Sequence, residues 1–112
     1  MLFRSISNGS ITAPQFAVSS NSFPPRGAIP TVSAAGTTNG IVWVLDLSAW
    51  GSANSGILDA YDANNVSTLL FSSPSSGTGA SGGAVKFTVP TVANGKVYVG
   101  GQSTVTVFGL LP

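Results

Sequence analysis

The sequence predicts an all-β protein that contains two copies of a four-stranded antiparallel unit. No stretch of the 112 residues carries apolar side chains at helical spacing, and Gly or Pro interrupts nearly every stretch of helix length. Strand-length runs rich in β-branched and aromatic residues recur instead. The stretch from Pro30 to Val44 returns in a shorter form from Pro90 to Val99, with Pro-Thr-Val, then Asn-Gly, then a Val-rich run in both copies. Each copy of such a repeat is usually one structural unit that buries its apolar face only against a neighbour.

The first unit contains all four strands. Its continuous apolar run, Ile41–Leu45, is typical of a strand that is covered on both faces. Asn39-Gly40 precedes this run, and Asn-Gly tolerates the positive φ angles of a two-residue hairpin turn, so we expect a hairpin turn there. We expect the four strands, designated A to D in order, at about 27–34, 41–47, 56–62 and 67–73.

The second unit lacks its last strand. A second hairpin turn is expected at Asn94-Gly95, and alternating polar and apolar residues on both sides of it predict strands. We expect strands A, B and C of this unit at about 84–93, 96–100 and 104–110. The inserts at 48–55 and 74–83 are rich in Gly, Ser and Ala, and they predict surface loops.

A further strand precedes the first unit. Phe16–Ser20 is similar to Leu69–Ser73 in strand D, so a D-like strand is expected at about 12–20. The chain then has the order D-ABCD-ABC. We interpret residues 1–112 as one partial domain, with repeats at about 16–73 and 74–110.

Composition excludes several classes of function. Charged residues make up only 6% of the chain and its formal net charge is +1, whereas ordinary domains carry about 25% charged residues. A basic surface of the kind that binds nucleic acid is therefore not expected. The chain has no Cys, which excludes disulfides and Cys-ligated zinc. Residues 1–20 lack the continuous apolar segment of a signal peptide, and the longest apolar run is too short to span a membrane.

A four-stranded antiparallel unit of roughly 40 to 55 residues has the length of a β-propeller blade. The first unit carries three motifs, Ile29–Val32, Gly40–Asp46 and Gly56–Ala63, and the second unit carries a related one, Val89–Gly100. Together these motifs resemble the PQQ-like repeat of quinoprotein-type β-propellers, and in particular the two carboxy-terminal blades of secreted bacterial members. Phe71 stands where that repeat usually has a docking Trp.

The resemblance implies two blades of a propeller and an extracellular or periplasmic location. Enzymatic members of this family are dehydrogenases that hold pyrroloquinoline quinone (PQQ) on Ca²⁺, and the alcohol dehydrogenases among them use a Glu, an Asn and an Asp. This chain contains no Glu, and no position matches those ligands. We therefore expect neither PQQ nor calcium, and the resemblance favours the non-catalytic members.

No catalytic, metal-binding or cofactor-binding residue is predicted. The chain has no His, Cys or Glu, the usual general bases and activators of nucleophiles. Oxygen ligands for Ca²⁺ are conceivable at Asp59, Asp62, Asn64 and Asn65, but such residues near a turn more often bond to the local backbone. The stretch Gly77–Gly82 matches G-x-G-x-x-G, yet no helix is expected after it, so we interpret it as a flexible loop.

Trp50 is the single candidate contact residue. It lies among Gly, Ser and Ala in the insert at 48–55, where an exposed Trp can contact a ligand or a partner surface or can cap the sheet. The other aromatic side chains lie mostly in strands, so we interpret them as core between blades.

Two blades do not close a ring, so the chain is expected to need further blades. It could self-associate head to tail, with the strand at 12–20 completing the unit of a neighbour, or it could be part of a longer propeller. We expect a non-catalytic scaffold or binding module. The alternatives are part of a PQQ-dependent dehydrogenase, and a carbohydrate- or surface-binding module that uses Trp50. The ligand is not identified by the sequence.

Overall fold

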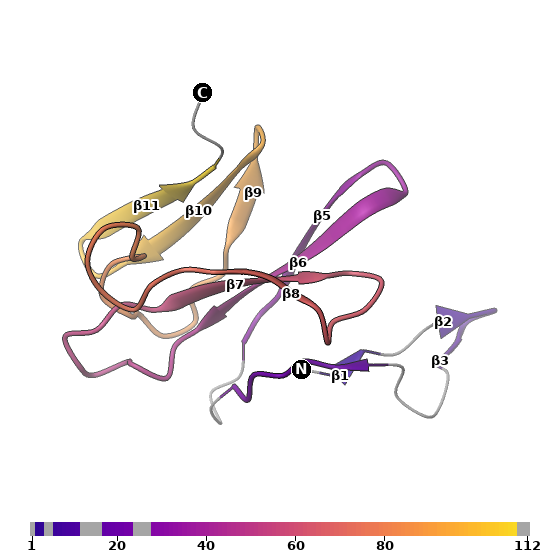
Figure 1. Ribbon diagram of the computed structural model, residues 1–112, viewed down its shortest axis with the longest axis horizontal. Coiled ribbons are helices and arrows are strands. Elements are labelled where there is room, and N and C mark those ends of the chain that lie inside the picture. Colours follow the sequence, from indigo (N-terminus) through magenta and orange to yellow (C-terminus); the bar gives the residue numbers. More distant parts are fainter. Residues whose placement is uncertain (1, 4–5, 12–16, 24–27, 110–112) are drawn as a thin grey trace.

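The computed structural model describes residues 2–3, 6–11, 17–23 and 28–109, and within them the regular structure consists only of β-strands. Two open antiparallel sheets, of four and three strands, form the body of the molecule (Figure 1). The predicted all-β class is therefore confirmed. In this part of the chain, no helix is long and apolar enough to cross a membrane.

The four-stranded sheet is an antiparallel meander in the order β5-β6-β7-β8. Its strands are β5 (Thr31–Ala35), β6 (Thr38–Asp46), β7 (Ile57–Asp62) and β8 (Leu69–Ser72). They correspond to the predicted strands A to D of the first unit, but β5 begins at Thr31 instead of about residue 27 and β6 begins at Thr38 instead of residue 41. Strand β6 holds the apolar run of this unit, whose β-branched and aromatic side chains suit the pleated surface of a sheet.

The three-stranded sheet repeats the first three strands of this meander, in the order β11-β10-β9. Its strands are β9 (Thr91–Ala93), β10 (Lys96–Gly101) and β11 (Thr104–Phe108). The prediction of a strand from about residue 84 is wrong for its first half. Phe87 has a φ of 62°, outside the β region, and the Thr88 hydroxyl donates to the Val85 carbonyl over 3.1 Å. The alternating pattern at 84–89 thus belongs to a turn.

The two Asn-Gly pairs have different roles. Asn94-Gly95 forms the predicted two-residue hairpin turn, with φ angles of 50° and 71° and Ala93 paired with Lys96. The prediction for Asn39-Gly40 is wrong, because both residues lie inside β6 and the turn is at Gly36-Thr37. The register shifts between Ser33 and Ala35, and the φ of 53° at Asn39 marks a β-bulge.

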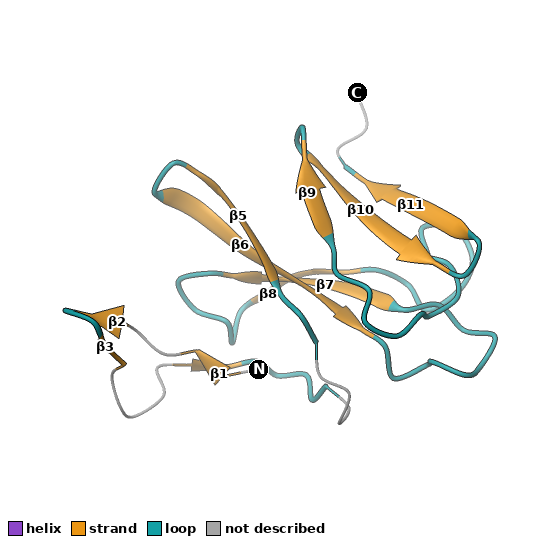
Figure 2. Cartoon of the chain, turned by 180° about the vertical axis from the view of Figure 1, so that it is seen from behind, coloured by secondary structure: helices purple, strands orange, loops and turns teal. Residues whose placement is uncertain are grey.

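The amino-terminal segment forms two small pieces of sheet. Strand β1 (Leu2–Phe3) pairs with β4 (Ala17–Val18), and β2 (Ile6–Ser7) pairs with β3 (Ser10–Ile11). Figure 2 shows the β2–β3 hairpin apart from the two main sheets. Of the D-like strand predicted at 12–20, the structure has strand geometry at β4, while residues 12–16 lie outside the described part.

A first apolar core lies between the two main sheets. Leu45, Leu47 and Leu58 of the four-stranded sheet and its adjoining loop pack against Val97 and Val99 of β10. Trp43 and Phe108 extend this core as partly buried neighbours. The two sheets therefore stack face to face, as in layered β-proteins.

A second core lies on the opposite face of the four-stranded sheet. It contains Val42, Val44, Tyr61 and Val66, and residues of the amino-terminal segment, Ala17 and Phe23 among them, pack against it. Odd and even residues of β6 thus point into different cores, as strand geometry requires. Both faces of this strand are covered, which confirms the prediction for its apolar run.

Candidate interaction surface

The two main sheets have equivalent faces, and these faces point in the same direction along the stack. The sequence repeat matches Val42 and Val44 of β6 with Val97 and Val99 of β10. In the four-stranded sheet this face meets the amino-terminal segment, and in the three-stranded sheet it meets the four-stranded sheet. Each sheet therefore turns its equivalent face toward the layer that precedes it in the chain.

The opposite face is buried in one sheet and open in the other. In the four-stranded sheet, Trp43, Leu45 and Leu58 cover the three-stranded sheet. The matching face of the three-stranded sheet carries Tyr98, Val105 and Val107, which the register places on the side away from buried Val97 and Val99. We call these three residues the outer face.

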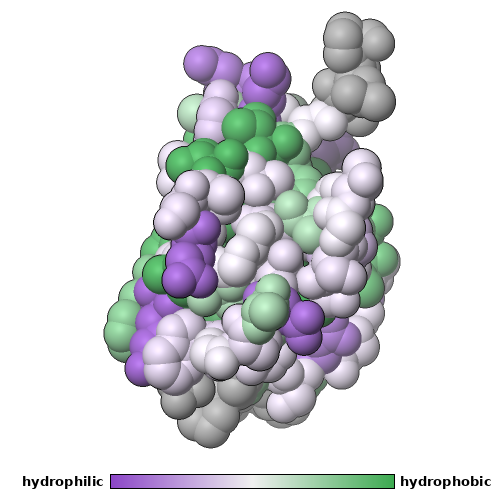
Figure 3. Space-filling model, turned by 90° about the vertical axis from the view of Figure 1, so that its left-hand side faces the viewer, coloured by the Kyte–Doolittle hydropathy of each residue, from purple (hydrophilic) through white to green (hydrophobic). Residues whose placement is uncertain are grey.

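The outer face is apolar and accessible. Val105 is 69% exposed and Val107 is 49% exposed, although both are strand valines. Figure 3 shows apolar surface gathered in the upper part of the side of the molecule on which β11 lies. Contiguous apolar surface of this kind is typical of interaction sites.

The edge of the three-stranded sheet at β11 is also open. In the four-stranded sheet, β8 occupies the corresponding position next to β7, but among the described residues no strand lies beside β11. Phe71 of β8 and Phe108 of β11 meet edge to face at this end, with ring centroids 6.1 Å apart and an interplanar angle of 65°. Phe71 is still 42% exposed.

A groove follows this edge between the two sheets. Its volume is about 570 Å³, and Trp43, Phe71 and Phe108 are among the residues that line it. The indole N–H of Trp43 donates to the Ser33 hydroxyl over 2.9 Å, which fixes the ring. The groove therefore has aromatic walls between the two sheets, next to the end of β11.

Trp50 lies in the loop between β6 and β7, as the sequence predicts. Its side chain is 40% exposed. The Lys86 ammonium nitrogen lies 3.5 Å from the centroid of its ring, in a cation–π contact. Together with Ser52 and Gln102, Trp50 borders a hollow of about 460 Å³. Lys86 thus covers part of Trp50 and places a positive charge over its ring.

Three of the residues considered as calcium ligands, Asp62, Asn64 and Asn65, lie at the turn after β7, whereas Asp59 is buried within β7. The Asp62 carboxylate accepts the Asn64 backbone N–H over 2.8 Å, and the Asn65 side-chain oxygen accepts the Ser67 hydroxyl over 2.6 Å. These are the bonds that Asx turns make to their own backbone and neighbours. Within the described part of the chain, no three His, Cys, Asp or Glu side chains form a cluster that could hold a metal ion.

Asp59 differs from the others because it is buried inside β7. Its Oδ2 atom accepts a hydrogen bond from the Asn21 amide over 2.9 Å and a longer one, of 3.4 Å, from the Tyr61 hydroxyl. Its Oδ1 atom is buried and has no hydrogen-bond partner. Burial and the nearby Asp59 carboxylate raise the pKa of Tyr61 to about 12. The sequence signal for this site was a carboxylate within an apolar strand.

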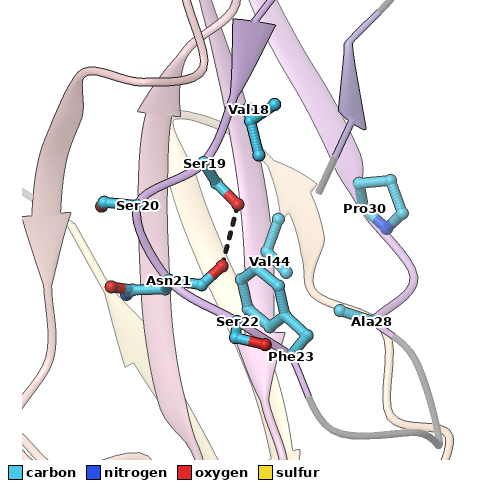
Figure 4. A pocket seen from close by; sticks show the side chains of 9 residues that line it. All are labelled: Val18, Ser19, Ser20, Asn21, Ser22, Phe23, Ala28, Pro30 and Val44. Carbon is cyan, nitrogen blue, oxygen red and sulfur yellow. Dashed lines mark hydrogen bonds between the residues drawn. The ribbon is translucent and has the colours of Figure 1, made fainter.

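Asn21 reaches Asp59 from the amino-terminal segment. In this segment the Ser19 hydroxyl donates to the Asn21 carbonyl oxygen over 3.0 Å (Figure 4). Asn21 also lines a hollow of about 430 Å³, together with Phe23 and Val44. The sequence did not predict that this segment would contact the four-stranded sheet. The contact depends on residues far apart in the chain.

The glycine-rich stretch Gly77–Gly82 is a loop in the structure, as expected. It joins β8 to the segment before β9, and no strand or helix adjoins it in the way that a dinucleotide site requires. The buried Ser81 hydroxyl donates to the Gly56 carbonyl oxygen, so the loop is attached to the start of β7.

Comparisons of this chain with family models, curated proteins and solved structures gave no match.

Proposed function

We propose that this chain is a non-catalytic module of the β-propeller type, a scaffold or binding unit that works by stacking against further sheets. The observation that carries the proposal is the outer face. Val105 and Val107 are exposed, although the residues at the equivalent positions of the four-stranded sheet are covered by the next layer. Complete burial of an aliphatic side chain contributes about 1.5–3 kcal/mol, so covering this face is favourable.

A second copy of the chain is the partner we propose. The face of its four-stranded sheet that holds Val42 and Val44 is equivalent to the face that β10 uses within one chain, and the amino-terminal segment already covers it, so this segment would meet the outer face. Head-to-tail contacts between unlike surfaces close into a ring when the rotation per copy permits it, and blades of a longer propeller would use the same surfaces. The low charge of the chain adds little repulsion between copies.

The mass in solution tests this proposal. A single copy has a mass of 11.2 kDa, whereas a closed ring of three or four copies would give about 34 or 45 kDa. We expect a multimer by light scattering, and a smaller mass for the Val105→Thr/Val107→Thr variant. Ile11→Thr changes an exposed residue of the β2–β3 hairpin and serves as the matched control. A monomer at all concentrations would overturn self-assembly.

The non-catalytic assignment is supported by the residue types available. The chain has no His, Cys or Glu, and the buried carboxylate of Asp59 is engaged by Asn21 rather than directed into an open cleft. Addition of PQQ and Ca²⁺ is expected to give no dye-linked oxidation of alcohols. Tight binding of PQQ with such oxidation would instead favour the dehydrogenase alternative.

A carbohydrate-binding surface at Trp50 is a second candidate function. The hollow beside Trp50 is bordered by an aromatic ring and the Gln102 amide, and the Lys86 ammonium lies over the same ring, a set suited to a saccharide that carries carboxylates. Polygalacturonate is expected to quench Trp fluorescence in the natural chain but not in Trp50→Phe, with dextran as the neutral comparison. Equal fluorescence with and without both polysaccharides would exclude this function.

A further inference from the structure

We propose that Asn8, at the tip of the β2–β3 hairpin, is a site of spontaneous modification at which the side-chain amide is lost as ammonia. The chain contains three Asn-Gly pairs, Asn8-Gly9, Asn39-Gly40 and Asn94-Gly95. The fold holds these three pairs to different degrees, and this difference selects Asn8. The modification is independent of the proposed self-assembly.

The reaction needs only the chain and water. The backbone nitrogen of the glycine attacks the carbonyl carbon of the Asn side chain, and a C–N bond forms. The side-chain nitrogen leaves as ammonia and takes the proton that the backbone nitrogen gives up. Water then opens the cyclic imide at one of its two carbonyl carbons, which yields aspartate or isoaspartate. Glycine favours the attack because it has no side chain to crowd the nitrogen.

The folded hairpin turns oppose this attack. Asn8 and Gly9 have φ angles of 50° and 76°, and Asn94 and Gly95 have φ angles of 50° and 71°. These are the left-handed central residues of a two-residue hairpin turn. In this conformation the next backbone nitrogen points away from the Asn side chain, whereas ring closure requires both on the same side. A turn must therefore open before it reacts, and the rate follows the free energy of local opening.

The turn at Asn94-Gly95 is held by the three-stranded sheet. It is closed by the pairing of Ala93 with Lys96, and β10 pairs with β9 on one edge and with β11 on the other. Val97 of β10 is 4% exposed and belongs to the core between the two main sheets. Opening this turn breaks strand pairing that the core supports, so we expect Asn94 to react slowly.

The pair Asn39-Gly40 is held on both sides as a part of β6. Ile41, the next residue, pairs with β5 on one edge and with β7 on the other. The Gly40 carbonyl oxygen accepts the Ala63 N–H over 2.9 Å. The Gly40 nitrogen cannot move toward the Asn39 side chain without disturbing these bonds, so Asn39 should also react slowly.

The hairpin that carries Asn8-Gly9 lacks such support within the described part of the chain. Strands β2 and β3 pair with each other through two residue pairs. Ile6 and Ile11 are 74% and 66% exposed, and the hairpin stands apart from the main sheets (Figure 2). An isolated two-stranded hairpin is only marginally stable in water. Of the three pairs, Asn8-Gly9 therefore opens at the lowest cost in free energy.

Conversion of Asn8 changes the hairpin in two ways. A carboxylate replaces the neutral amide, which lowers the formal net charge of the chain from +1 to zero. The isoaspartyl form also adds a carbon to the backbone at the tip, so a two-residue turn no longer closes the pairing of Ser7 with Ser10. Aged chains should therefore differ from new ones at this hairpin.

Storage of the natural chain in neutral buffer tests the assignment. Peptide mass spectrometry measures the converted fraction at each Asn-Gly pair, and a parallel sample in concentrated urea gives the rate at each pair without the fold. In urea we expect similar rates, since Gly follows each Asn. In the folded chain, Asn8 should convert nearly as fast as in urea, whereas Asn39 and Asn94 should convert at least about tenfold more slowly.

Isoelectric focusing of two variants identifies the residue independently. The first acidic product of the natural chain should focus with Asn8→Asp, and this variant should form no further acidic band over the same time. Asn94→Asp is the matched control and should still form one; Asp, like Asn, tolerates the left-handed conformation. Protection of Asn8 equal to that of Asn94 in the folded chain, or earlier conversion of Asn94 or Asn39, would overturn the assignment.

Discussion

Asn21 and Asp59 form the contact that joins the amino-terminal segment to the four-stranded sheet. The Asp59 side chain is almost fully buried, and one of its two oxygens has no hydrogen-bond partner. Buried acceptors without a partner are costly, so the bonds to the other oxygen matter more than they would at the surface. The Asn21 amide supplies the shorter of these, and it comes from a segment far away in the sequence.

Asn21→Ala is expected to destabilise the protein. The change removes the donor 2.9 Å from the buried Asp59 oxygen, and hydrogen bonds to charged groups contribute about 1.5–3 kcal/mol. Chemical denaturation should show a loss of free energy of unfolding in this range. Asn64→Ala is the control, because its exposed side chain lies at the surface turn after β7. Equal stability of the two variants would contradict this role for Asn21.

Tyr61 should make stability depend on alkaline pH. Burial first, and then the nearby Asp59 carboxylate, raise its pKa from 10.0 to about 12 in the folded chain. The folded state therefore holds the phenol proton more tightly than the unfolded state, and this stabilisation is complete below pH 10. Stability should fall as pH rises from 10 to about 12. The fall should be smaller in Tyr61→Phe, as measured by denaturation at each pH; an identical fall would contradict the assignment.

The β5–β6 hairpin shows how a local turn signal can be overridden by packing. Asn39-Gly40 has the sequence of a turn, yet it forms a bulge within β6. The Gly40 carbonyl accepts the Ala63 N–H over 2.9 Å. A Cβ atom at Gly40 would lie only 2.8 Å from the Ala63 Cβ. The glycine is thus required for the close approach of β6 to Ala63 in the turn after β7, not for the hairpin turn.

Gly40→Ala is expected to destabilise the chain for this steric reason. The added methyl must displace Ala63 or the backbone, and such overpacking costs about 1–3 kcal/mol. Ala63→Gly removes the opposing Cβ atom, so the double variant should recover part of the loss. A double-mutant cycle of unfolding free energies measures this coupling. Additive effects would show that the two positions do not clash.

The strands that the sequence predicted best have long β-branched or aromatic runs. Strands β7 and β10 follow their predicted bounds closely, because their side chains fill the cores of the stacked sheets, whereas β6 begins three residues before its predicted start. The strand start at 84 was wrong because the alternation there competes with a turn at Phe87. Trp50 was placed in its loop correctly, but its contact with Lys86 joins this loop to the turn before β9, which no local pattern predicts. Periodicity reports local geometry, whereas such contacts depend on how the layers meet.

The whole molecule is a stack of layers whose equivalent faces all point the same way along the stack. The amino-terminal segment, the four-stranded sheet and the three-stranded sheet follow one another, and each layer presents its equivalent face to the one before. The last layer ends in the outer face and an open edge. Among the described residues, the first layer contributes the short strand β4, and the last layer has three strands where the middle layer has four. This open face and edge are the basis of the self-assembly that we propose.

Association of this kind should make the melting temperature depend on protein concentration. A partner that binds only the folded chain stabilises it by mass action, so the melting temperature should rise as the protein is concentrated. Scanning calorimetry over a hundredfold range of concentration measures the effect. In Val105→Thr/Val107→Thr the rise in melting temperature should be smaller, because hydroxyl groups would then enter an apolar contact. In dilute solution the stability of this variant should stay close to that of the natural chain, since both side chains are exposed in a single copy. Ile11→Thr should retain the full dependence. A melting temperature that does not change with concentration in the natural chain would mean that the folded chain is stable without its neighbours.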